Sequence, residues 1–501
     1  MTVSPRNRWA VLVTVAAGLL LITLDNSILY TALPTLTREL GASQTQGLWI
    51  INAYPLVMAG LLLGAGTLGD RVGHRLMFLI GLVLFGIASL VAAFAPTANV
   101  LIAARAFLAV GAAAMMPATL ALLRVSFTDE KERNFAIAIW GSISVIGVAL
   151  GPIISGFLLS HFWWGSVFLV NVPVVALAFI STLIVAPRVA PDRSRHWDFV
   201  SSVLALVSLA ALVIAIKETA HAGQSWAVPA AAAAIGLIST LLFTRRQSRL
   251  ADPLLNFALF RNPAFLAGTL AAAFAMFAFA GLQLATTQRF QLVAGFTPMQ
   301  AGILVSLAAI GSLPTAMLGG AFLHRIGLRI LIAGGLAVAT VGVLIATLGI
   351  SHGIGWLIAG SVLAGAGVGA AMSVASTAIV GNAPVKNAGM AASVEEVSFE
   401  FGSLIAVALL GSLMAAVYSL GVVLPGGIAA AARDSLPNAL SIADEMGADG
   451  IALKQAASTA FDRAFLMVMY VVAGVIALGA LFTGVLLRSY GPGSQSSHYP
   501  H

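Results

Sequence analysis

The sequence predicts an all-α membrane protein in which two six-helix bundles are joined by two inserted helices, about fourteen transmembrane helices in all. Three observations lead to this fold class. The 501 residues are 60% hydrophobic and only 9% charged, whereas a soluble chain keeps roughly a quarter of its residues charged. Long apolar runs recur along the whole chain, and one short pattern occurs once in each half.

The apolar runs are long enough for transmembrane helices, because a bilayer core needs about 20 apolar residues per helix. Strands of a barrel would alternate polar and apolar residues at every second position, and these runs do not. The predicted spans are 9–33, 48–69, 76–95, 98–123, 135–159, 166–187, 199–217, 227–244, 264–288, 299–322, 330–350, 354–380, 388–418 and 464–487.

Lysine and arginine set the predicted orientation, because the inner loops of membrane proteins carry an excess of both. With the N-terminus inside, 18 of the 25 lysines and arginines fall in inner segments. Six fall outside, Lys217 among them, and Arg105 lies within a span. Both termini are therefore predicted to be cytoplasmic. Segment 245–263 is predicted to be an amphipathic inner connector, and 421–463 an external loop with one or two short helices.

An internal repeat predicts that the two halves of the chain are homologous. GTLGDRVGHR (66–75) and GAFLHRIGLR (320–329) share two glycines and two arginines at the same places, each between two spans on the inner side. The predicted units are a first bundle at 9–187, an inserted pair at 199–244, a second bundle at 264–487 and a cytoplasmic tail at 488–501. Many secondary transporters are built from such repeats and bind substrate at mid-membrane between the halves.

Several chemistries are excluded by what the sequence lacks. There is no cysteine, so neither a disulfide nor a thiolate metal site is possible. No lysine follows a glycine, which excludes the P-loop of an ATP-driven pump. No histidine cluster falls within a span, so we expect no metal, no cofactor and no enzymatic activity. The net charge of +7 is explained by the inner loops, and nucleic acid is not an expected partner.

Four of the 18 acidic residues fall within predicted spans: Asp25 in LITLDNSILYTALP, and Glu395, Glu396 and Glu400 in SVEEVSFEFG. An ionisable group inside a bilayer costs about 2.5 kcal/mol or more and is functional by default. The alternative is a structural ion pair with Arg105, but one cation cannot neutralise four acids. Because desolvation and mutual repulsion disfavour ionised carboxylates, we expect these acids to exchange protons or cations, as a proton-coupled transporter requires.

Helical geometry separates the four acids. Glu396 and Glu400 are four residues apart and share a helix face, whereas Glu395 is turned roughly 100° away. At 1.5 Å per residue, Glu400 lies about 18 Å from the inner end of its span, near mid-membrane. Asp25 lies about 24 Å from the start of the first span, in the outer half. Aromatic and methionine side chains near the acids are expected to bind cations and apolar groups: Tyr30, Tyr54, Phe399, Phe401 and Met390.

Taken together, these motifs resemble the major facilitator superfamily, and specifically its fourteen-span drug:proton antiporters. GTLGDRVGHR is similar to the family's inner-loop motif, whose Asp and Arg form a conformational latch. LIAARAFLAVGAAAMMPATLAL is similar to the fourth-span motif, whose Arg is tied to proton transfer. The resemblance assigns these roles to Asp70 and Arg71, with Gly66, Gly73 and Arg75 beside them, and to Arg105.

The fifth span contains GVALGPIISG, which resembles the antiporter motif of the same family. Its positions here are Gly147, Gly151, Pro152 and Gly156. Independently of the family, small residues allow two helices to approach closely, and proline loosens the backbone. We therefore expect this segment to lie where helices must move against each other.

Within the superfamily, LWIINAYPLVMAG and AASVEEVSFEFG are most similar to the bacterial quaternary-ammonium and methyl-viologen exporters. That subgroup often has Asp where this chain has Asn52, which is therefore a candidate substrate-binding residue, and its exporters of divalent cations carry Asp where this chain has Ser312.

The resemblance implies proton-driven export of amphipathic, cationic compounds across the bacterial inner membrane. The protein is expected to be a monomer whose partners are lipophilic cations and membrane lipids, with the proton gradient as its energy source. The alternatives are a specific exporter of an antibiotic or metabolite, or an amino-acid permease of the same fold.

Overall fold

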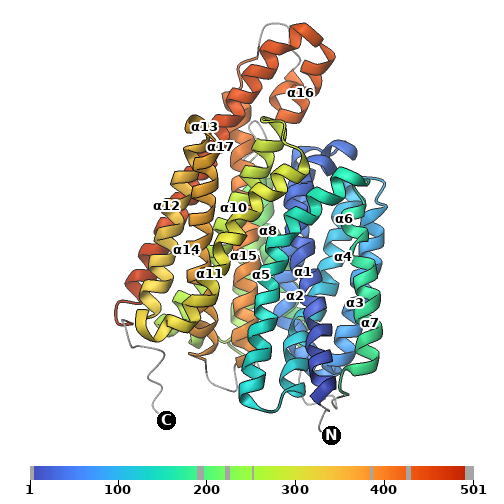
Figure 1. Cartoon of the computed structure of the whole chain (residues 1–501), viewed down its shortest axis with the longest axis vertical. Helices are drawn as coiled ribbons and strands as arrows, with labels where there is room; N and C mark the ends of the chain where they lie inside the picture. Colours follow the sequence, from blue (N-terminus) through green and yellow to red (C-terminus); the bar gives the residue numbers. More distant parts are fainter. Residues whose placement is uncertain are drawn as a thin grey trace.

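The computed structural model of the chain describes residues 5–188, 197–219, 226–250, 253–383, 388–424 and 430–490. Within these ranges the chain is almost entirely helical and contains no strand (Figure 1). Thirteen helices of the described residues are long and apolar enough to cross a bilayer, and α5 contributes a shorter apolar stretch, Ile146–His161. The all-helical membrane fold with about fourteen spans is therefore confirmed.

The first six spans pack around α1 and α4. They are α1 (Pro5–Glu39), α2 (Gln44–Val72), α3 (His74–Ala93), α4 (Ala98–Ser126), α5 (Glu130–His161), and α6 (Ser166–Leu169) with α7 (Asn171–Val185). Helix α1 contacts α4, α5 and α7, and α4 also contacts α2 and α3.

The next two spans, α8 (Phe199–Thr219) and α9 (Ala227–Gln247), pack against each other, and α8 also contacts α2 and α15. The start of α8 and the end of α9 are joined by an ion pair in which Arg246 Nε and Nη2 donate to the Asp198 carboxylate at 2.7 and 3.0 Å. This hydrogen bonding lowers the pKa of Asp198 to about 2. The connector that follows contains one short 3₁₀ helix, η1 (Phe257–Arg261).

The last six spans form a second set of packed helices. They are α10 (Pro263–Leu292), α11 (Pro298–Ile326), the combined η2 (Ile330–Gly334), α12 (Gly335–Thr347) and α13 (Gly349–His352), then α14 (Ile354–Val380), α15 (Ala388–Gly421) and α17 (Ile451–Leu486). Helix α14 contacts α10, α11 and α12, and α17 contacts α10, α12 and α15. The division into two bundles and an inserted pair at the predicted boundaries stays a prediction.

The loop predicted at 421–463 is shorter than expected, because α17 begins at Ile451 and not at 464. Leu453, Ala457 and Phe461 are buried at helical spacing, so the apolar face of the span continues outward beyond the bundle (Figure 1). The remaining segment contains η4 (Ala430–Arg433), α16 (Leu436–Glu445) and η5 (Gly447–Gly450), and α16 packs against α17.

Helix α1 begins and α17 ends at the same end of the bundle, whereas α16 lies at the opposite end (Figure 1). We call the first the inner end and the second the outer end. The turns between α2 and α3 and between α11 and η2 both contain a glycine with positive φ, 101° at Gly73 and 85° at Gly327. Each glycine N–H donates to the carbonyl four residues earlier at 2.8 Å. The two copies of the repeat thus share one backbone conformation that favours glycine.

The glycines of the fifth-span motif lie at close helix contacts. A Cβ at Gly147 would lie 2.0 Å from Thr23 Oγ1, and one at Gly151 would lie 2.6 Å from Ser27 Cβ, so both face α1. A Cβ at Gly156 would lie 2.5 Å from Met299 Cα on α11. In the same contact, a Cβ at Gly302 would lie 2.1 Å from the carbonyl oxygen of Pro152. Helix α5 therefore contacts α1 through the short side chains of Thr23 and Ser27, and contacts α11 with no side chain between the two backbones.

We predict that Gly156→Ala destabilises the protein by about 1–3 kcal/mol, the usual cost of overpacking. The added methyl group would overlap backbone atoms of α11, which cannot rotate away as a side chain can. The matched control is Gly474→Ala on α17, where nothing lies within 4 Å of the new Cβ. Thermal unfolding of the purified proteins in one detergent measures both, and equal midpoints for the two variants would contradict the close contact.

Candidate functional site

Asp25 and Arg105 form a buried ion pair among the first six spans. Nη1 of Arg105 donates to Oδ2 of Asp25, and the two side chains are 0% and 1% exposed, respectively. Nδ2 of Asn171 donates to Oδ1 of Asp25 at 3.0 Å and to Ser89 Oγ at 3.2 Å. Both oxygens of Asp25 are therefore engaged, by groups from α4 and α7.

Arg105 is also held by α2. Its Nε donates to the carbonyl oxygen of Ile50 at 3.3 Å, and its guanidinium carbon lies 4.6 Å from the centre of the Tyr54 ring. Nη2 of Arg105 and the hydroxyl of Tyr54 are buried without a hydrogen-bond partner in the described part of the chain. The guanidinium group thus connects three helices and keeps one donor available.

Two interpretations of Asp25 followed from the sequence: an acid that exchanges protons or cations, and a structural ion pair with Arg105. The structure contains the ion pair. Asn171, which supplies the second partner, was missed, although FLVNVP places an amide inside an apolar run. A direct contact of Asp25 with substrate stays a prediction.

The three glutamates of α15 lie in two different environments. Glu395 is 8% exposed and faces α14, where Ser376 Oγ lies 2.7 Å from both of its oxygens. Glu396 and Glu400 are half-buried, and Oε2 of Glu400 has no hydrogen-bond partner among the described residues. The helical spacing that separates Glu395 from the other two is therefore found in the structure.

Helix α15, which carries Glu400, packs against α2, whose Ile50 and Tyr54 contact Arg105. Arg105 and Glu400 interact electrostatically, and Glu400 also interacts electrostatically with Tyr30 and Tyr54. The Tyr30 hydroxyl is 3.0 Å from Oγ of Ser403, less than one turn beyond Glu400 on α15. Arg105 is thus paired with Asp25 and also close enough to Glu400 to influence its charge.

Several buried polar groups near this contact have no hydrogen-bond partner within the described ranges. Asn52 on α2 is fully buried, and both atoms of its amide are unpartnered. A buried amide without partners costs about 1–3 kcal/mol, and the role of Asn52 in substrate binding stays a prediction. Gln283, Thr286 and Thr287 on α10 are similarly buried. These three residues were not predicted, although QLATTQ is a polar stretch within an apolar span.

Two of the side chains expected beside the acids lie elsewhere. The sulfur of Met390 accepts a hydrogen bond from the backbone N–H of Asn256 at 3.1 Å, so Met390 packs on the inner connector. Phe401 is exposed at the surface of the bundle, where 36% of its area is accessible.

Lys217 was predicted to lie in an outer segment, yet its side chain is 1% exposed and its Nζ lies 4.1 Å from the centre of the Trp49 ring. Helix α8 extends through Thr219, which keeps Lys217 inside the packed region.

The residues of the inner-loop motif lie at the turn between α2 and α3. Asp70 pairs with Nε2 of His74 at 3.1 Å, Arg71 is exposed, and Arg75 donates to the carbonyl oxygen of Leu183 at 2.7 Å. A Cβ at Gly66 would lie 3.7 Å from Oγ of Ser393, so α2 is close to α15 here. The latch role of this motif stays a prediction. No group of three or more possible metal ligands is found in the described part of the chain.

We predict that Asp25→Asn and Arg105→Gln each destabilise the protein by about 3–5 kcal/mol, because each leaves one buried charge unpaired. The double variant should lose less than the sum of the two, since it leaves no unpaired charge. The control is Asp462→Asn, which removes the partly exposed pair of Asp462 with Arg289 (2.9 Å) and should cost about 1 kcal/mol or less. Thermal unfolding of all four variants measures the coupling, and additive losses would show that the pair is not structural.

Comparison with known families and proteins is consistent with this geometry. The sequence profile of the Major Facilitator Superfamily matches residues 15–297 and 269–433. The multidrug efflux pump LfrA of Mycolicibacterium smegmatis is 37% identical over 498 residues, covering 97% of this chain and 98% of that protein. The methyl viologen resistance protein SmvA of Salmonella typhimurium is 34% identical over 462 residues, covering 91% and 93%. The tetracenomycin C resistance and export protein of Streptomyces glaucescens is 32% identical, covering 81% and 76%.

Solved structures show the same fold. A bacterial homolog of the human lysosomal transporter Spinster, in an inward-facing and unoccupied conformation, matches with a TM-score of 0.68 over 99% of both chains at 18% identity. A POT family transporter in complex with 5-aminolevulinic acid matches with a TM-score of 0.64 and 14% identity, covering 96% of this chain and 97% of that one. At these identities the likeness concerns the arrangement of helices alone.

Proposed function

The chain belongs to the Major Facilitator Superfamily, and we propose that it exports amphipathic, cationic drugs, dyes or biocides in exchange for protons. It is a multi-pass membrane transporter of small molecules and not an enzyme. Its relatives include pumps named for multidrug efflux and for methyl viologen resistance, which supports export of cations. The excess of lysine and arginine in the inner loops supports a bacterial inner-membrane protein with both termini in the cytoplasm.

The observation that carries this proposal is the pair Glu396 and Glu400. Asp25 is neutralised by Arg105, and Glu395 accepts from Ser376, whereas Glu400 is half-buried and keeps an unpartnered oxygen. Two carboxylates one helical turn apart in a water-poor site repel each other when both are ionised. A bound proton or a bound cation relieves this repulsion, so binding of one disfavours binding of the other. That competition is what an antiporter of protons and cations requires.

Arg105 provides the route by which the charge of Glu400 acts on the first bundle. The guanidinium group is shared between Asp25, the carbonyl of Ile50 and the ring of Tyr54, and Nη2, which has no partner among the described residues, can donate to a further carboxylate. An ionised Glu400 attracts Arg105, and a protonated one releases it to Asp25. We infer that protonation thereby changes how strongly α15 is held to α2 and α4.

Tyr30 and Tyr54 make the same place suitable for a lipophilic cation. Both rings are buried beside Glu400, and an aromatic face attracts a cation by about 0.5–2 kcal/mol. Asn52 can supply a polar contact, because its amide has no protein partner in the described residues. The second candidate function is export of one particular antibiotic or metabolite, which the tetracenomycin C relative favours.

We predict that proteoliposomes of the purified protein, loaded with a fluorescent lipophilic cation, release it faster when the outside is made acidic. A protonophore should abolish the acceleration, because the proton gradient is the proposed energy source. A neutral antibiotic and an amino acid should be tested in the same assay. Release of the antibiotic alone would indicate a specific exporter, and release of the amino acid alone would indicate a permease. Release that does not respond to the pH gradient for any compound would contradict proton exchange.

We predict that Glu400→Gln abolishes proton release when substrate is added, because the amide mimics the protonated acid and cannot ionise. The matched control is Glu395→Gln, five residues earlier on the face bonded to Ser376, which should keep most proton release. Proton release in weakly buffered detergent solution, followed with a pH-sensitive dye, measures both. If Glu400→Gln releases protons as the unmodified protein does, the coupling site lies elsewhere.

A further inference from the structure

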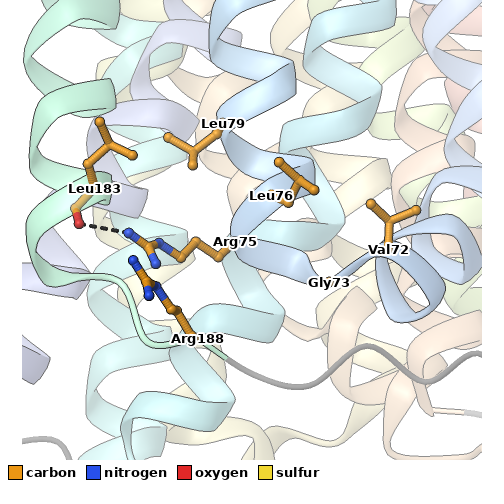
Figure 2. A pocket seen from close by; sticks show the side chains of 7 residues that line it. All are labelled: Val72, Gly73, Arg75, Leu76, Leu79, Leu183 and Arg188. Atoms are coloured by element: carbon orange, nitrogen blue, oxygen red, sulfur yellow. Dashed lines mark hydrogen bonds between the residues drawn. The ribbon is translucent and has the colours of Figure 1, made fainter.

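A second region with polar and apolar side chains lies at the inner end, on helices far in sequence from the acids of α15. A cavity of about 300 Å³ opens between the start of α3 and the end of α7. Its lining residues are Val72, Gly73, Arg75, Leu76, Leu79, Leu183 and Arg188 (Figure 2). None of them belongs to the proposed substrate site; Gly73 and Arg75 are part of the inner-loop motif, whereas Arg188 lies outside it.

The polar part of the cavity is formed by Arg75 and Arg188, whose guanidinium groups lie next to each other (Figure 2). Arg75 donates to the carbonyl oxygen of Leu183, near the end of α7, at 2.7 Å. Its Nε is shielded from solvent and has no partner among the described residues, and no ion pair to either arginine is found there. Two adjacent cations repel each other, so an anion between them would be stabilising.

The apolar part of the cavity faces away from the protein. Leu76 and Leu183 are 50% and 48% exposed, in helices that span the membrane. Leu79 lies one turn further into α3. Exposed leucine side chains are expected against lipid chains, whereas a site for a soluble anion needs only the arginines. The arginines are at the end where α3 begins and α7 ends, and the leucines continue from there along the two spans.

We propose that this cavity binds an anionic phospholipid of the leaflet at the inner end, with the phosphate on Arg75 and Arg188 and an acyl chain along Leu76, Leu79 and Leu183. Arginine suits this ligand because its planar donors match phosphate oxygens, and basic pockets between helices are known to accept anionic headgroups. Arg75 is two residues after Gly73, whose positive φ forms the turn between α2 and α3. The bound lipid therefore stabilises the turn that carries Asp70 and Arg71.

The experiment measures lipid binding to the full-length protein and does not depend on transport. Delipidated protein in detergent is titrated with phosphatidylglycerol or phosphatidylcholine of the same acyl chains, and bound lipid is counted by native mass spectrometry. We expect Arg188→Gln to weaken phosphatidylglycerol binding roughly tenfold, the loss of one charge-assisted contact. Arg188→Gln leaves the bond from Arg75 to Leu183 intact, so its effect is not a failure of folding. The matched control is Arg124→Gln, another exposed arginine at the inner end, which should bind as the unmodified protein does.

Three results would overturn the proposal. Equal binding of the two lipids would show that the headgroup charge is not recognised. Unchanged binding by both Arg188→Gln and Arg75→Gln would place the lipid elsewhere. Competition by millimolar inorganic phosphate would show that the cavity takes a free anion, whereas no competition together with weaker binding at high salt supports the lipid. Because transport is not measured, failure here leaves the proposed export function untouched.

Discussion

The ion pair between Asp25 and Arg105 is the interaction on which the functional core depends. Neither group reaches water, since the side chains are 1% and 0% exposed, and either charge alone would be several kcal/mol too costly in this environment. Asn171 and Ser89 complete the coordination of Asp25, and Ile50 and Tyr54 that of Arg105. Helices α1, α2, α4 and α7 are thus held in one arrangement by the need to satisfy two buried charges.

The acids of α15 lie in two environments, and only one of them is influenced by this fixed arrangement. Nη2 of Arg105 and the hydroxyl of Tyr54 have no partner among the described residues, and the charge of Arg105 influences Glu400 on α15. Glu395, only five residues earlier, is turned toward α14 and bonded to Ser376. One short sequence therefore supplies two kinds of acid: one that joins helices of the second bundle, and one that faces the contact between the bundles.

The sequence was sufficient for the number and the approximate places of the spans, because hydropathy depends on composition alone. It also predicted the different orientation of Glu395, which follows from helical periodicity. It could not pair Asp25 with Asn171, because that contact joins spans that are 146 residues apart. The start of α17 at Ile451 was missed because Lys454, Asp462 and Arg463 resemble a loop, although Leu453, Ala457 and Phe461 keep helical spacing. The burial of Lys217 depends on how far α8 continues, and hydropathy does not define helix ends.

The inserted helices are attached more closely to one bundle than to the other. A Cβ at Gly60 would lie 2.9 Å from Leu206 Cα, and one at Gly64 would lie 2.3 Å from Ser202 Oγ, so α8 rests on α2 almost backbone to backbone. Lys217 over Trp49 adds a cation–π contact between the same two helices. Toward α15, α8 shares an apolar cluster with Leu404 and Ala408. Helix α15 carries the acids that we propose to exchange protons, and an apolar contact on this side with a closer contact on α2 would suit a shift of α15 that leaves the inserted pair on the first bundle.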